Sequence, residues 1–189
     1  MTSAYLALAL RFAIALILIL AFAGKVKDGP TRFSSQVDTY GVFPRKLSKP
    51  VAWSVLIIEP MLAGALILGG TSAGPAVAAA ALFATFAYVG WRGRLGALGG
   101  ADCGCLGASV KLRLTRVSTG ANATVAVLAG SVAVIQVLSV VPLPPSDVAG
   151  MVFAWVAAAA LCGLYWLLLF AASVADSMGT SSRPGRVPS

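Results

Sequence analysis

The sequence contains no histidine and little charge, and each shortage excludes a class of protein. Of 189 residues, 11% are charged and 59% are hydrophobic, and the mean hydropathy is +0.91. A soluble domain carries about 25% charged residues, so this chain is too apolar to cover its surface in water, and its solvent is lipid. Without histidine we expect no bis-histidine haem, no histidine-ligated metal and no imidazole base.

Five long apolar runs take up most of the chain, and each approaches or exceeds the roughly 20 residues that a helix needs to span a bilayer. No basic residue precedes Arg11, whereas Lys25 and Lys27 follow the first run. That run is therefore predicted to be a retained helix rather than a cleaved signal peptide. The fold class is an all-α integral membrane protein. We expect spanning helices at about residues 4–24, 51–70, 73–91, 119–141 and 147–175, followed by a disordered tail at residues 176–189.

The distribution of Lys and Arg predicts the orientation of these helices. Five spans place the loops 25–50 and 92–118 and the C-terminal tail on one side, and these segments hold every basic residue except Arg11. Loops rich in Lys and Arg stay in the cytoplasm. We therefore expect a multi-pass protein of the cell membrane, with its N-terminus outside and its basic loops and C-terminus inside. Attraction to anionic lipid accounts for the net charge of +8 without a nucleic-acid partner.

The first basic loop is predicted to contain a short helix. Asp28 is a candidate N-cap with Pro30 in the first turn, and the Gly41-Val42-Phe43-Pro44 segment ends the helix. Its apolar side chains fall on one face, which predicts an interfacial helix on the inner leaflet that anchors the bundle. These side chains are Phe33, Val37 and Tyr40.

The most distinctive local motif is Cys103-Gly104-Cys105. Thiolates are nucleophiles, and two of them one residue apart can exchange electrons as a dithiol and a disulfide. A disulfide across one residue is strained and therefore oxidising, and Gly104 and Gly107 give the backbone the freedom that such a turn requires. The alternative is a pair of incidental small residues in a loop. A metal site is disfavoured, because two thiolates without histidine leave zinc short of ligands. Cys162, inside the fifth run, is interpreted as a packing residue.

Charged and polar residues inside the apolar runs form a second candidate site. A charge in mid-helix costs about 2.5–3.5 kcal/mol on insertion scales, so it faces the bundle interior and finds a partner. Helical rise leaves Arg11 and Glu59 about 8 Å apart along the membrane normal, within reach of two long side chains. Lys25 is a rival partner for Glu59. Both a structural ion pair and a polar pocket for a proton or a quinone headgroup remain open, with Asn122 either joining the pocket or bonding another helix.

These features, in this order, resemble the MauE/DoxX-like family of small membrane proteins, and the MauE branch in particular. The resemblance covers about residues 4–142 and implies a four-helix membrane domain there, so that residues 147–175 form an additional spanning helix. The elements that carry it are Arg11, Gly24-Lys25, the stretch from Phe33 to Tyr40-Gly41-Val42-Phe43-Pro44, Glu59, Cys103-Gly104-Cys105-Leu106-Gly107 and the polar start of the fourth span around Asn122.

The resemblance also implies a redox-associated role. MauE is linked to maturation of the disulfide-rich small subunit of methylamine dehydrogenase beside a thioredoxin-like partner, and DoxX relatives are associated with sulfur or quinone-linked redox systems. We therefore expect a membrane thiol–disulfide redox protein of MauE type in which Cys103 and Cys105 exchange, assisting oxidative maturation of a partner or relaying electrons; whether it acts as an oxidoreductase enzyme stays open. The alternative is a non-catalytic accessory subunit of a larger membrane redox complex. A transporter is disfavoured, because the sequence shows no inverted repeat.

One expectation conflicts with another. The charge distribution places the cysteine loop in the cytoplasm, whereas oxidative maturation takes place outside it. Two arrangements reconcile them: the loop re-enters the membrane to meet its partner, or the protein relays electrons outward from a cytosolic thiol donor.

Overall fold

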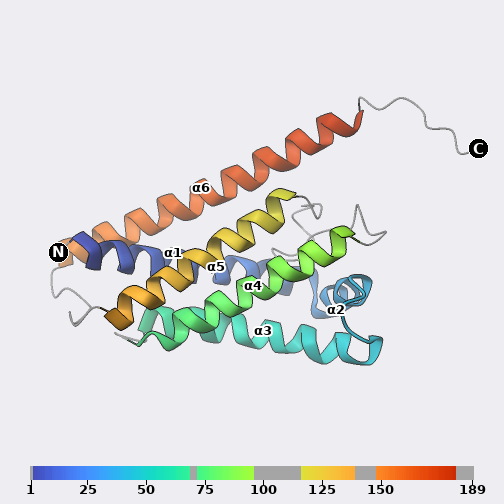
Figure 1. The fold of residues 1–189 in the computed structure, drawn as a ribbon, viewed down its shortest axis with the longest axis horizontal. Helices are drawn as coiled ribbons and strands as arrows, with labels where there is room; N and C mark the ends of the chain where they lie inside the picture. Colours follow the sequence, from blue (N-terminus) through green and yellow to red (C-terminus); the bar gives the residue numbers. More distant parts are fainter. Residues whose placement is uncertain (1, 69–71, 96–115, 139–147, 182–189) are drawn as a thin grey trace, which may run out of the picture.

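A computed structural model describes residues 2–68, 72–95, 116–138 and 148–181 of the chain, and every regular element in these ranges is a helix. Figure 1 shows the long helices running roughly along one axis, with a short helix at one end. The six helices are α1 (Thr2–Asp28), α2 (Pro30–Thr39), α3 (Arg45–Leu68), α4 (Gly74–Leu95), α5 (Arg116–Leu138) and α6 (Val148–Ser181).

The five long helices confirm the prediction of an all-α membrane fold. Each of them has a segment long and apolar enough to cross a bilayer, so the chain is a multi-pass membrane protein whose outer surface contacts lipid. The helices begin or end beyond the predicted apolar runs, because a helix continues through flanking polar residues into the headgroup region. Helix α6 ends at Ser181, so residues 176–181, which were predicted to belong to the disordered tail, are helical.

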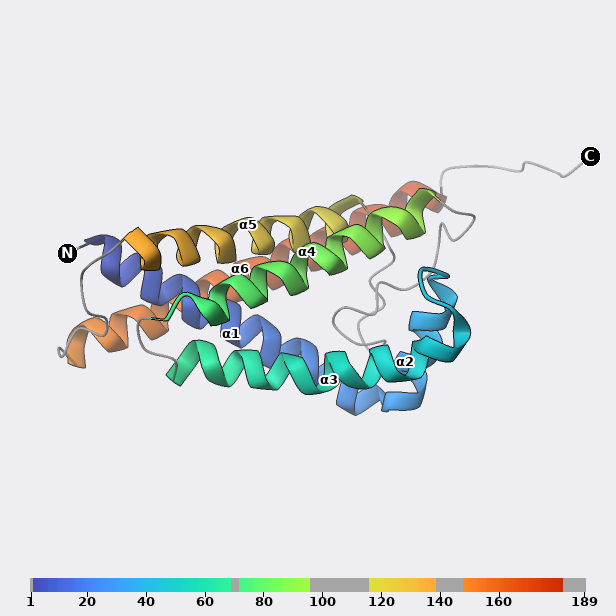
Figure 2. The same cartoon turned by 60° about the horizontal axis from the view of Figure 1, so that its bottom comes forward.

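Helix α1 is the central helix of the bundle. Of its spanning segment, 61% is buried inside the protein, whereas the other four spanning segments are 22–33% buried. It packs against α3, α5 and α6, while α4 and α5 form a second closely packed pair, an arrangement that Figure 2 shows from another side. The polar groups on α1 are therefore shielded from lipid on several sides.

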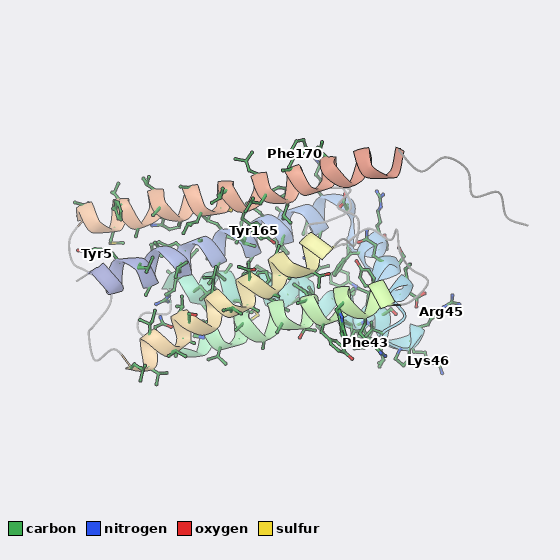
Figure 3. All side chains as sticks on the ribbon, turned by 45° about the horizontal axis from the view of Figure 1, so that its top comes forward. Tyr5, Phe43, Arg45, Lys46, Tyr165 and Phe170 are labelled. Carbon is green, nitrogen blue, oxygen red and sulfur yellow. The ribbon has the colours of Figure 1, made fainter. Side chains whose placement is uncertain are left out.

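Small residues bring α6 close to α1. Ala154 and Ala158 are fully buried against the first half of α1, and the ring of Trp155 stacks on that of Phe12 with a centroid distance of 4.3 Å. Cys162 continues the same buried stripe in the main core. Large residues on the other side of α6, such as Phe170, point away from the bundle toward lipid (Figure 3).

Helix α2 begins at Pro30 as predicted, but its cap differs from the prediction. The N-cap is Gly29 with φ of 87°, and no side chain caps the helix; Asp28 is instead the last residue of α1. A positive φ is readily adopted only without a Cβ. At the other end, Gly41 with φ of 62° donates its N–H to the Asp38 carbonyl at 3.1 Å, the usual way in which a glycine ends a helix.

The apolar face of α2 packs on the protein rather than on the inner leaflet, which corrects the predicted lipid contact. Phe33 and Val37 are buried against Ala52 and Leu56 of α3. Both α3 residues lie inside the predicted apolar run, so the spanning helix itself covers this face of α2.

Candidate functional site

A fully buried ion pair joins α1 to α3 near the end of the bundle that carries α2. Lys25 Nζ donates a hydrogen bond to Glu59 Oε1 at 2.5 Å, and both side chains have no solvent exposure. Lys25 lies in the last turn of α1, and Glu59 lies in the buried stripe of α3 with Leu56 and Ala63. Of the two partners that the sequence allowed for Glu59, the structure pairs it with Lys25.

Aromatic rings from two further helices surround the ammonium group. Lys25 Nζ lies 5.3 Å from the ring centroid of Phe33 in α2 and 5.6 Å from that of Phe86 in α4. At these distances a ring face attracts a cation. Four helices thus meet at one charge. Phe86 was not predicted from the sequence, because a phenylalanine in an apolar run carries no signal of its own.

One carboxylate oxygen of the pair is left over. Glu59 Oε2 is buried and has no hydrogen-bond partner. A buried acceptor without a donor is uncommon and costs free energy. The next residue is Pro60, which has no N–H. The carbonyl of Leu56 therefore lacks the helical hydrogen bond that it would otherwise accept from residue 60. The site therefore has acceptor capacity available for a proton or a hydrogen-bond donor.

Arg11 lies apart from this pair, nearer the other end of α3. Its guanidinium Nη2 donates to the backbone carbonyl of Leu66 at 2.7 Å, and the residue is 2% exposed. Leu66 is in the last turn of α3, where carbonyls lack helical donors and a cation is favoured. Arg11 therefore caps the C-terminus of α3, whereas Glu59 pairs with Lys25.

Three further polar residues are buried in α5: Ser118, Asn122 and Gln136. Asn122 is 4% exposed and lies on the same face as Ser118 and Val125, near the start of the helix. Gln136, near the end of the helix, is 8% exposed, and neither its amide nitrogen nor its amide oxygen has a hydrogen-bond partner. A polar residue inside an apolar run was a sequence signal for Gln136 that the sequence analysis did not use.

The cysteine pair falls in a different part of the chain. Cys103 and Cys105 lie outside the described residues, whereas Cys162 is a buried free thiol. Within the described ranges, no three Cys, Asp or Glu side chains gather as metal ligands.

Fold and site together define a class: a polytopic helical membrane protein whose central helix carries a buried ion pair. Comparison with known families narrows this class. The family described as methylamine utilisation protein MauE matches residues 3–136, and the chain belongs to this family. The match takes in α2, α3, α4 and nearly all of α1 and α5, and it ends before α6 begins.

No curated protein and no solved structure matches the chain. The family match includes Arg11, Lys25, Glu59, Asn122 and the Cys103–Cys105 motif.

Proposed function

We propose that this protein is a membrane thiol–disulfide redox protein of MauE type, with Cys103 and Cys105 as the exchanging pair. The observation that carries the proposal is the Cys-Gly-Cys motif itself, which lies inside the stretch that matches the family. Neighbouring thiols flanked by glycines suit a reactive dithiol rather than a structural cross-link.

The proposed reaction is exchange with a partner dithiol, such as that of a thioredoxin-like protein. A partner thiolate attacks one sulfur of the Cys103–Cys105 disulfide, and the bond between the pair breaks as a mixed disulfide forms. The second partner thiolate then attacks the partner sulfur of this mixed disulfide, and the cysteine of this chain leaves as a thiolate. The partner leaves with a disulfide, and this chain holds a dithiol with two more electrons and two more protons.

Turnover requires an acceptor for those electrons and protons, and a membrane quinone fits that requirement. Lys25, Glu59 and Asn122 are proposed as the polar intramembrane site; Arg11, the fourth residue expected there, lies nearer the other end of α3 and donates to the Leu66 carbonyl. Two observations support it: Lys25 and Glu59 are fully buried in the spanning region, and Glu59 Oε2 lacks a donor. In this proposal Oε2 accepts the proton or the headgroup hydroxyl.

A double substitution, Cys103→Ser with Cys105→Ser, tests the proposal. We expect loss of exchange with a thioredoxin-like partner but unchanged insertion and helix content, because both residues lie outside the spans predicted from the sequence. The matched control is Cys162→Ser, since Cys162 is a buried packing residue, and it is expected to retain exchange. Each single cysteine variant is expected to accumulate a mixed disulfide on a non-reducing gel. Full activity in the double variant contradicts the proposal.

A second candidate function is a non-catalytic accessory subunit of a larger membrane redox complex. One observation favours it. Gly120 and Thr124, one turn apart on α5, are exposed, and no atom lies within 4 Å of a Cβ added at Gly120. A small-residue face of this kind allows another helix to approach closely. Stable co-purification with a partner, together with indifference to cysteine loss, distinguishes this function from the first.

A further inference from the structure

The end of the bundle that carries α2 presents exposed basic side chains from three helices. We refer to them as the basic end surface. Figure 3 shows two of them, Arg45 and Lys46, projecting outward at this end. The members are Lys27 of α1, Arg32 of α2, and Arg45, Lys46 and Lys49 of α3, all exposed to solvent.

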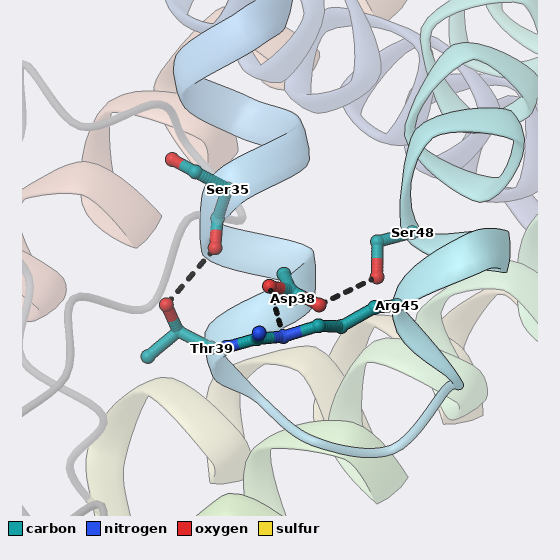
Figure 4. A network of polar contacts seen from close by, with 5 residues as sticks. All are labelled: Ser35, Asp38, Thr39, Arg45 and Ser48. Carbon is teal, nitrogen blue, oxygen red and sulfur yellow. Dashed lines mark hydrogen bonds and ion pairs between the residues drawn. The ribbon is translucent and has the colours of Figure 1, made fainter.

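The acidic residues of the region do not neutralise this surface. Asp28 and Asp38 are the acidic residues of the described segment 25–50, against five exposed cations. The Asp38 carboxylate is already engaged, because it accepts a hydrogen bond from Ser48 at 3.2 Å and pairs with Arg45 at 3.3 Å (Figure 4). The surface therefore retains a net positive charge.

The same contacts hold the shape of the surface. Asp38 is on α2, and both of its partners are on the first turns of α3, so the pair of contacts fixes the corner between the two helices. The packing of Phe33 and Val37 on α3 fixes it from the inner side. The cations of α2 and α3 are thus displayed on a defined scaffold.

Apolar and aromatic side chains place this surface at the level of lipid headgroups. Val26 and Leu47 are about half exposed although each is next to a basic residue, which suits a boundary between hydrocarbon and water. Trp53, Tyr88 and Trp91 are also about half exposed, and all three are near the ends of α3 and α4 that face this side. Tryptophan and tyrosine gather at the membrane–water boundary.

We propose that the basic end surface binds the headgroup of an anionic phospholipid. The phosphodiester and any further anionic group of such a lipid accept hydrogen bonds from the Lys and Arg side chains. Its acyl chains lie along the apolar part of α3 that follows Pro50. A zwitterionic phospholipid carries a compensating ammonium group, so the surface selects against it.

The test uses the purified full-length protein in detergent, equilibrated with equal amounts of phosphatidylglycerol and phosphatidylcholine that carry the same acyl chains. Native mass spectrometry measures the ratio of the two lipids retained. We expect preferential retention of phosphatidylglycerol. In the variant Lys27→Gln, Lys46→Gln, Lys49→Gln, this preference is expected to fall by about fivefold for each charge removed, since each basic residue near an anionic surface contributes on the order of 1 kcal/mol.

The matched control keeps the charge and changes only the side chain: Lys27→Arg, Lys46→Arg, Lys49→Arg. It is expected to retain the preference, with helix content by circular dichroism equal in all three proteins. Equal retention of the two lipids by the unaltered protein overturns the proposal. So does an arginine variant as impaired as the glutamine variant, or a surface that retains inorganic phosphate without preferring the anionic lipid.

Discussion

At the scale of single residues, the buried pair of Lys25 and Glu59 carries a large desolvation cost. Removing two charges from water costs several kcal/mol for each ion, and their attraction offsets this only when both are present. The rings of Phe33 and Phe86 add a favourable contact for the cation. Each charge is therefore tolerated because the other is there.

This dependence predicts a non-additive response to substitution. Lys25→Met leaves a buried carboxylate without its cation, and we expect a loss of about 3–5 kcal/mol in the free energy of unfolding. Adding Glu59→Leu to that variant is expected to restore most of the loss, because the second charge is then also removed. Chemical unfolding in detergent, analysed as a double-mutant cycle, measures the coupling. Additive losses in the cycle argue against an energetically coupled pair.

Residue-scale reasoning from the sequence identified the buried charges but not their partners. An intramembrane charge must find a partner, and that requirement pointed to Arg11, Lys25 and Glu59. Depth along the helix axis allowed either Arg11 or Lys25 as the partner of Glu59, because depth contains no information on the rotation of each helix. The Leu66 carbonyl that receives Arg11 is a backbone group at a helix end, and the sequence marked neither its position nor its lack of a helical donor.

At the scale of elements, the five spans were predictable because lipid imposes a length on them. The fit of α2 to α3 was not predictable in the same way. An amphipathic pattern of Phe33, Val37 and Tyr40 is equally compatible with lipid and with a protein surface. The structure places Ala52 and Leu56 of α3 against it, and no sequence signal marks that contact. The contacts of Asp38 with Ser48 and Arg45 follow from that fit, so the sequence analysis missed them as well.

Gly150, near the start of α6, lies where this helix meets the Tyr5 side chain of α1. A Cβ built on Gly150 would overlap the ring of Tyr5 in α1. We therefore expect Gly150→Ala to lower the free energy of unfolding by about 1–3 kcal/mol, the usual cost of overpacking. Thermal unfolding in detergent measures the change.

The same helix offers a matched control. Gly163 has open space where a Cβ would go, so Gly163→Ala is expected to be neutral or to stabilise by about 0.5–1 kcal/mol through helix propensity. Tyr5→Ala is expected to rescue Gly150→Ala, since it removes the overlapping ring. Equal effects of the two glycine substitutions contradict a specific role of the Tyr5 contact.

At the scale of the whole molecule, α6 stands outside the part that matches the MauE family, yet it covers the first half of the central helix α1. Without it, the face of α1 that contains Ala9 and Ala13 would meet lipid.

An odd number of spans also separates the two termini: the first residues of α1 and the last residues of α6 lie at opposite ends of the bundle (Figure 1). The basic segment between α1 and α3 is at the same end as the C-terminus of α6.

The charge rule predicts which end of the bundle faces the cytoplasm, and two described positions allow a direct test of that prediction. Ser35 on α2 and Ser72 between α3 and α4 are both exposed, and they are at opposite ends of the bundle. In a background where Cys103, Cys105 and Cys162 are changed to Ser, we introduce Ser35→Cys or Ser72→Cys. An impermeant thiol reagent added to intact cells is expected to label the Ser72→Cys variant, and to label the Ser35→Cys variant only after the membrane is opened. Lys and Arg near the ends of spans are held on the cytoplasmic side during insertion, and the Ser35 end carries all of them in the described residues except Arg11. The reverse labelling pattern would place the basic end surface outside the cell.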